Sequence, residues 1–215
     1  AYKNDGTDTG FAQRVGDHGD ALFWFGLSAS GARDDTSSNR GLIVQNHENI
    51  NDQYLHPNGG TSTGGVRPEA EAIKEIECHG VSVVEYTQGA KNVWSFSATS
   101  TFNRRITPNT PTVFNGPAKG SNLLRTPHSP TGVAGRGTNN NCANGYTPRA
   151  TPPTCQENLA GHFRPTGHDA TRTAQEEASL PPHRPTPASA NHGWASVTSA
   201  GSATHPLPPA PAPRT

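Results

Sequence analysis

Large apolar residues are scarce in this chain. Leu, Ile, Val and Phe together number 31 of 215 residues, or 14%, which is below the roughly 20% under which chains tend to be disordered. The shortage is uneven, because residues 1–114 hold 23 of the 31 and residues 165–215 hold only 3. We therefore expect a conventional hydrophobic core only in the first part of the chain.

Several other features are missing. No stretch approaches the length of about 18 consecutive apolar residues that a membrane span needs, and the N-terminus has no secretory signal pattern. The 17 basic and 17 acidic residues are mixed and cancel, which disfavours sequence-independent binding to nucleic acid or to an anionic membrane. Methionine is absent, even at position 1. The missing start and the missing signal indicate a piece of a longer protein.

Cysteine is also rare. Cys78, Cys142 and Cys155 are too few and too irregularly spaced for a disulfide framework, and the gap between the last two does not form a zinc CxxC pair. The sequence also contains no GxSxG elbow, phosphate-binding Walker loop or HExxH helix. These absences leave no standard catalytic motif on which to base a function.

The residues that are present predict short strands separated by polar turns. Apolar or alternating runs predict strands at residues 22–25, 41–44, 81–86 and 93–97, the last two as a hairpin, with weaker candidates at 112–114 and 123–124. One helix is expected to begin near Pro68 and to end before Gly80, with Ala70, Ile73 and Ile76 on one face. The spacing favours an antiparallel all-β architecture with a minor helix, such as a propeller or sandwich.

The end of the chain has a different composition. Ten of the 20 prolines fall within residues 165–215, and the rest of that segment is mostly Ala, Ser, Thr and His. We therefore divide the chain into a globular region at residues 1–163 and a low-complexity, disordered tail at residues 164–215.

Three polar segments contain groups that can bind metal. Residues 46–49 place an amide, an imidazole and the Glu48 carboxylate at a strand end, which suits a hard cation or is simply a solvated loop. Cys142 lies among polar residues and glycine, a poor setting for a buried structural cysteine, so it is either a ligand or reactive thiol or part of a chance turn. Cys155 is followed closely by Glu157, in a metal site or in a polar loop. A site mixing hard and soft donors is consistent with all three.

Two further segments give weaker signals. Residues 16–20 could form an oxygen-rich cation loop but lack the spacing of a calcium loop. Arg104 and Arg105 could hold an anion or form surface ion pairs.

Taken together, these segments resemble the PhoX-type alkaline phosphatases. The most specific part is Asn-Cys-Ala-Asn-Gly-Tyr-Thr-Pro at 141–148, followed by Thr-Cys-Gln-Glu-Asn at 154–158. Further matching segments occur in the order of the family, at residues 3–7, 15–18, 40–48, 50–57, 79–83, 102–107 and 116–118.

The resemblance implies a fold, a reaction and ligands. The family fold is a β-propeller with helical insertions, and its members hydrolyse phosphate monoesters with a cluster of iron and calcium ions. By this resemblance Cys142 is an iron ligand, and Glu48 and Glu157 are metal-binding glutamates of the same cluster. The resemblance also implies export to the periplasm or beyond by the twin-arginine route, phosphate esters as the binding partner, and a monomeric state.

The chain also departs from the family pattern. Arg149-Ala150 stand where the family has Trp-Gly, Gln156 replaces a usual Glu, and Pro152-Pro153 remove two backbone donors before Glu157. Beyond residue 163 only scraps of the pattern survive, which we interpret as a damaged reading frame or a degenerate copy. We expect an incomplete β-propeller, inactive alone because further ligands are absent. The alternative is a non-catalytic calcium-binding or surface-interaction β module.

Overall fold

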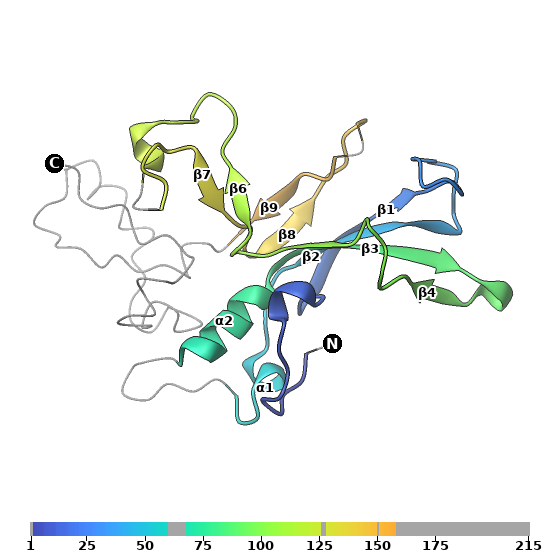
Figure 1. The fold of residues 1–215 in the computed structure, drawn as a ribbon, viewed down its shortest axis with the longest axis horizontal. Coiled ribbons are helices and arrows are strands. Elements are labelled where there is room, and N and C mark those ends of the chain that lie inside the picture. The colour runs from blue at the N-terminus through green and yellow to red at the C-terminus, as the bar shows by residue number, and fades with distance from the viewer. Residues whose placement is uncertain (1, 60–67, 126–127, 150, 158–215) are drawn as a thin grey trace, which may run out of the picture.

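The computed structural model describes residues 2–59, 68–125, 128–149 and 151–157. Within these ranges the chain is mostly β with two short α-helices (Figure 1). This confirms the mostly-β prediction with a minor helix. The described strands form one open sheet and two hairpins and no closed barrel, an arrangement compatible with part of a propeller. The tail expected at 164–215 lies outside the described residues.

The elements are short and follow one another closely. In chain order they are η1 (Phe11–Gln13), β1 (Gly19–Gly26), β2 (Arg40–His47), α1 (Asp52–Leu55), α2 (Glu69–Cys78), β3 (Gly80–Gln88), η2 (Ala90–Asn92), β4 (Trp94–Phe96), β5 (Arg104–Ile106), β6 (Pro111–Val113), η3 (Asn122–Leu124), β7 (Ala134–Arg136), β8 (Asn141–Asn144) and β9 (Thr154–Gln156). None of the described helices is long and apolar enough to cross a bilayer.

The main sheet is antiparallel, with strand order β1-β2-β3 and with both β4 and β5 paired to the far edge of β3. β2 and β3 pair along their whole length, from Arg40 opposite Thr87 to His47 opposite Gly80. Gly80 has a positive φ of 104°, and a Cβ atom there would lie 2.1 Å from the carbonyl oxygen of Ile106. Glycine therefore allows β5 to approach the start of β3.

The hydrophobic core is divided into two clusters. The first covers one face of the main sheet and consists of Phe25, Val44, Val81 and Val83, with Phe23, Leu42 and Ile106 packed against it. A second small core, formed by Ile50, Leu55, Ala72, Ile76 and Cys78 with Tyr2, joins the two helices to the N-terminal segment. Figure 1 shows the helices below one end of the sheet and the two hairpins above it.

Helix α2 has the predicted bounds, and of the face predicted to be interior Ile76 is buried and Ile73 is half-buried. Ala70 is exposed, whereas Lys74, Glu75 and Glu77 are buried. Lys74 tolerates burial because its ammonium donates to Asp8 Oδ1 at 2.9 Å and to the carbonyl oxygens of Lys3 at 2.6 Å and Leu55 at 2.5 Å. Apolar periodicity did not predict the burial of these charged residues, because paired buried charges do not appear in a hydrophobic pattern.

Several short strands were not predicted. β5, β7, β8 and β9 are each three or four residues long, too short and too polar to show alternation. The pair at 123–124, expected in a strand, lies instead in the 3-10 helix η3. The predicted hairpin is confirmed, because Tyr86 of β3 pairs with Phe96 of β4.

Substitution of Glu85 by glutamine tests how much the hydrogen bonds of this buried carboxylate on β3 contribute to stability. The Glu85 carboxylate accepts hydrogen bonds from Ser100 Oγ and from Arg40 Nε, the latter at 2.8 Å, and these two contacts lower the pKa of Glu85. We expect Glu85→Gln to lower the free energy of unfolding at pH 7 by about 1–2 kcal/mol, a modest value because the Arg40 side chain is partly exposed.

The pH dependence of this effect has a definite sign. Because the pKa of Glu85 is lower in the folded state, its contribution is full above the unfolded value of about 4.3 and is lost as the pH falls through the folded value. Urea unfolding at pH 7 and at pH 3 should therefore show a wild-type advantage that shrinks in acid. Glu69→Gln, at an exposed position of α2, is the control. An advantage of Glu85 that is equal at both pH values would contradict the prediction.

Candidate metal centre

The β8–β9 hairpin holds two of the predicted ligands. Cys142 lies in β8 and Glu157 directly follows β9. The hairpin register pairs Asn141 with Gln156, and an irregularity separates this pair from the next one. The Glu157 amide donates to the carbonyl oxygen of Asn140 at 2.9 Å. The backbone therefore fixes Glu157 beside the strand that carries Cys142.

The hairpin is attached to the end of β2. Asn46 is 1% exposed, and its Nδ2 donates to the carbonyl oxygen of Ala143 at 3.3 Å. Its Oδ1 accepts a hydrogen bond from Thr154 Oγ1 at 2.9 Å. One amide side chain thus contacts both strands of the hairpin, two residues before Glu48.

The structure brings Glu48, Cys142 and Glu157 together. Burial raises the pKa of Glu48, and a side-chain hydrogen bond with Glu157 and the nearby charge of Asp20 raise it further. A side-chain hydrogen bond with Glu157, followed by burial, raises the pKa of the Cys142 thiol. Glu157 is therefore the shared neighbour of the other two groups.

This donor set fits a cation. The pKa of Glu48 is raised first by burial and then by its hydrogen bond with Glu157, and the pKa of Cys142 is raised first by its hydrogen bond with Glu157. A bound cation would favour the deprotonated forms of both groups. Carboxylate oxygens suit calcium and iron, whereas a thiolate suits iron and not calcium. The donor types of these three side chains are those of a mixed hard and soft metal site, which stays a prediction.

Buried amides support the same interpretation. Asn139, Asn140 and Asn141 are 3%, 6% and 0% exposed, and their side-chain oxygens have no hydrogen-bond partner within the described ranges. Buried amide oxygens normally have a partner, which can be an ordered water or an ion. These residues immediately precede Cys142 in the chain, and their unpaired oxygens are open to an ordered water or an ion.

Within residues 46–49 only Glu48 reaches the hairpin as a possible ligand. His47 contacts Ser82 Oγ on β3 at 2.9 Å, and burial lowers its pKa to about 4. Asn49 is exposed, and Asn46 is the link to the hairpin. Residues 46–49 therefore do not act as one polar cluster: Asn46 holds the hairpin, His47 contacts β3, and Glu48 is the candidate ligand. Successive strand residues separate in this way because they point to opposite faces.

Asp20 is a further acidic neighbour of the centre. It lies in β1, and its charge acts on Glu48. The polar segment at residues 16–20 contained the signal, but its spacing does not match a calcium loop. Only the pairing of Gly19 with His47 places this segment beside the end of β2.

The remaining cysteines and arginines do not join the centre. Cys155 is exposed on β9, and Cys78 is buried at the end of α2, where burial raises its pKa to about 12. The guanidinium of Arg105 is bonded to backbone carbonyl groups and forms neither the anion site nor the surface ion pair that the sequence suggests. Arg104 lines the cavity described next.

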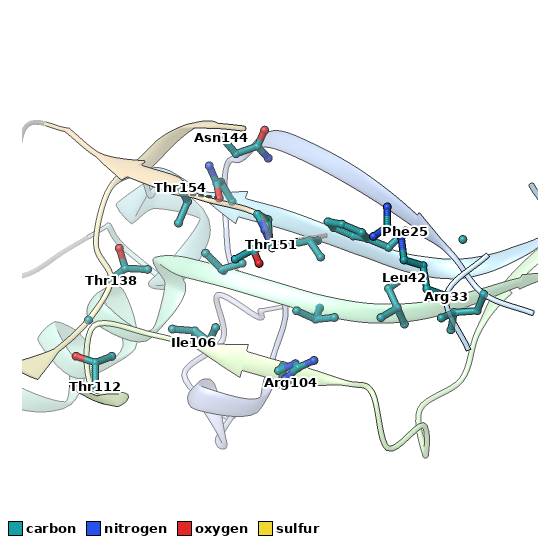
Figure 2. A pocket seen from close by; sticks show the side chains of 18 residues that line it. Phe25, Arg33, Leu42, Arg104, Ile106, Thr112, Thr138, Asn144, Thr151 and Thr154 are labelled. Atoms are coloured by element: carbon teal, nitrogen blue, oxygen red, sulfur yellow. Dashed lines mark hydrogen bonds between the residues drawn. The ribbon is translucent and has the colours of Figure 1, made fainter. Parts of the chain in front are cut away.

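A cavity of about 580 Å³ lies over the apolar face of the sheet (Figure 2). Phe25, Leu42 and Ile106 form its apolar wall, and Asn144 and Thr154 of the hairpin close one end. Tyr146 holds the hairpin against this face, since its ring stacks on Phe23 with centroids 5.0 Å apart. The cavity is adjacent to the hairpin, but its lining includes none of the three candidate ligands.

Comparison with known proteins identifies the family. The model of the alkaline phosphatase PhoX family matches residues 3–200. A solved structure, "Pseudomonas fluorescens PhoX in complex with vanadate, a transition state analogue", is 28% identical with a TM-score of 0.68. The alignment covers 89% of this chain and 32% of that one, so this chain spans about a third of its length. No curated protein matches.

The family match, the mostly-β fold and the gathering of Glu48, Cys142 and Glu157 agree with one another. The match also extends beyond residue 157 and so includes part of the tail. This chain belongs to the PhoX family of alkaline phosphatases.

Proposed function

We propose that this chain carries part of an iron- and calcium-dependent active site for the hydrolysis of phosphate monoesters. The observation that supports it best is the contact of Glu157 with both Glu48 and Cys142. Glu48 lies about a hundred residues before the other two groups, and its hydrogen bond with Glu157 supports a shared site. Membership of an alkaline phosphatase family supplies the reaction class.

The residues have distinct roles in this proposal. Cys142 holds iron as a thiolate and does not attack the substrate. Glu48 and Glu157 hold the cations through hard oxygen atoms, and their negative charge balances that of the metal. Bound metal acts as a Lewis acid that stabilises negative charge on the phosphoryl oxygens. Asn46 positions the hairpin so that the two halves of the site remain in register.

Catalysis is proposed to require parts of the family fold beyond these 215 residues, because the chain spans about a third of the matched PhoX structure. We expect the chain alone to bind metal and to lack turnover. Export to the periplasm or beyond by the twin-arginine route is also proposed from the family resemblance. Phosphate esters are the proposed substrate class.

Metal analysis of the purified chain tests the proposal. We expect iron and calcium in the wild-type protein, with iron content reduced at least about 10-fold in Cys142→Ser because the soft ligand is lost. Cys155→Ser changes an exposed cysteine of the same hairpin and should retain iron. Hydrolysis of a synthetic phosphomonoester, with and without calcium, is measured on the same samples.

Each outcome has a clear consequence. Loss of iron only in Cys142→Ser, without turnover, supports a partial active site. If the wild-type protein and both variants bind calcium and none of them binds iron, the result would instead support the non-catalytic calcium-binding module. Calcium-dependent turnover by the chain alone would contradict the expectation that further ligands are needed.

A further inference from the structure

A second group of metal-binding side chains lies between the two helices. His56 directly follows α1, and Glu71 and Glu75 lie one turn apart on α2. One donor atom from each of the three lies within 4.8 Å of the other two. His56 Nε2 and Glu75 Oε1 are 2.8 Å apart. The group uses none of the residues of the centre on the β8–β9 hairpin.

The group is largely buried. Glu75 is 0% exposed and His56 is 5% exposed, whereas Glu71 is half-buried. His56 and Glu75 form an ion pair when the imidazole is protonated, and in the neutral imidazole the same Nε2 atom can bind a metal instead. A divalent cation would bind this nitrogen and both carboxylates, and the half-buried Glu71 gives it a route from solvent.

The donor types select the kind of metal. One imidazole nitrogen and two carboxylate oxygens suit Zn²⁺ and other first-row divalent ions, whereas calcium takes oxygen ligands only. Three protein ligands also leave a fourth position for water. The two carboxylates are four residues apart, so one helix presents both on the same side.

We propose that His56, Glu71 and Glu75 form a divalent-metal site, selective for zinc over calcium, that fastens α1 to α2. The adjacent core residues Leu55 and Ile76 come from the same two helices, so bound metal would strengthen an existing contact. The site is independent of the phosphatase centre and does not depend on the function proposed above.

Zinc titration of chelator-treated protein tests the site. The protein carries Cys142→Ser and Cys155→Ser, which remove the iron ligand and the exposed thiol. We expect binding of one zinc ion by calorimetry and a rise in Tm of roughly 5–10 °C at zinc 100-fold above Kd. Calcium at the same concentration should give no comparable rise.

Three variants on that background locate the ligands. His56→Gln and Glu71→Gln should each weaken zinc binding at least about 10-fold and remove most of the Tm rise, since each loses one of three ligands. Glu69→Gln, exposed in the first turn of the same helix, should bind as the parent does. Glu71→Gln is the decisive variant if His56→Gln does not fold, because Glu71 is only half-buried. Absence of zinc-dependent stabilisation, or its full retention in Glu71→Gln, would overturn the site.

Discussion

Arg105→Met is expected to lower the free energy of unfolding by about 3–5 kcal/mol, the largest effect of any single substitution that we predict. Arg105 donates from Nε to the carbonyl oxygen of Arg14 at 2.7 Å. Its Nη1 donates to the carbonyl oxygens of Val81 and Ile106, and its Nη2 to those of Glu77 and His79. Five carbonyl groups from four segments therefore share one guanidinium.

The size of the effect follows from the number of bonds. A hydrogen bond to a charged group contributes about 1.5–3 kcal/mol, and water entering the site would replace some of the bonds lost. Arg105 is half-buried, and this burial lowers its pKa. Domains are stable by only about 5–15 kcal/mol, so the predicted loss is a large part of the total.

Thermal unfolding followed by circular dichroism measures this effect. A loss of about 3–5 kcal/mol corresponds to a decrease in Tm of roughly 10 °C for a chain of this size. Arg104→Met, at the exposed neighbouring position on β5, is the matched control and should leave Tm nearly unchanged. Arg105→Lys should also be unstable, because three donors on a flexible stem cannot reach five carbonyl groups. Equal Tm values for Arg105→Met and Arg104→Met would contradict this account.

The second large effect is expected on metal binding. Asn46→Ala removes the hydrogen bonds to Ala143 and Thr154 that join the end of β2 to the hairpin. Because Glu48 is on one side of this link and Cys142 on the other, we expect metal affinity to fall about 10–100-fold, as for other residues that orient ligands. The loss of stability should be smaller, about 1–3 kcal/mol, so the protein should stay folded.

Comparison with an exposed neighbour separates positioning from a general loss of structure. Asn49→Ala changes an exposed amide one residue beyond Glu48 and should retain both metals. Iron and calcium content, measured at equal fractions of folded protein, gives the result. Unchanged metal content in Asn46→Ala would show that the hairpin finds its place without this link. A calcium titration of the folded variant then gives the change in affinity directly.

The longer elements could be predicted from sequence because their signals are local. The aromatic run at 22–25 and the apolar run at 41–44 lie in β1 and β2, and the helix signals near Pro68 locate α2. The predicted face of α2 is right for the buried Ile76 and wrong for the exposed Ala70, and the pattern gave no sign of the buried Lys74. A buried lysine is stable only with partners that are distant in sequence, and no local pattern reports them.

The candidate ligands were also identified from sequence, through resemblance to the family. What the sequence could not show is which neighbouring residues share their role. Asp20 and Asn46 are ordinary polar residues in the sequence. The antiparallel pairing of β1 with β2 brings Asp20 near Glu48, and Asn46 donates a hydrogen bond to the hairpin. Their functions depend on contacts across about 30 and about 100 residues of chain.

The distribution of large apolar residues predicted a core in the first part of the chain, because burial of apolar surface is the main force that stabilises folding. The core residues of the described part of the chain lie between Tyr2 and Ile106. The unusual polar setting of Cys142 by itself left open a site and a chance turn, and the resemblance to the family favours the site. Only the tertiary structure decided that Glu157 meets both Glu48 and Cys142 and that His56 meets two glutamates of α2. Such groups assemble through strand pairing and helix packing, so their distance in space cannot be predicted from their separation in the sequence.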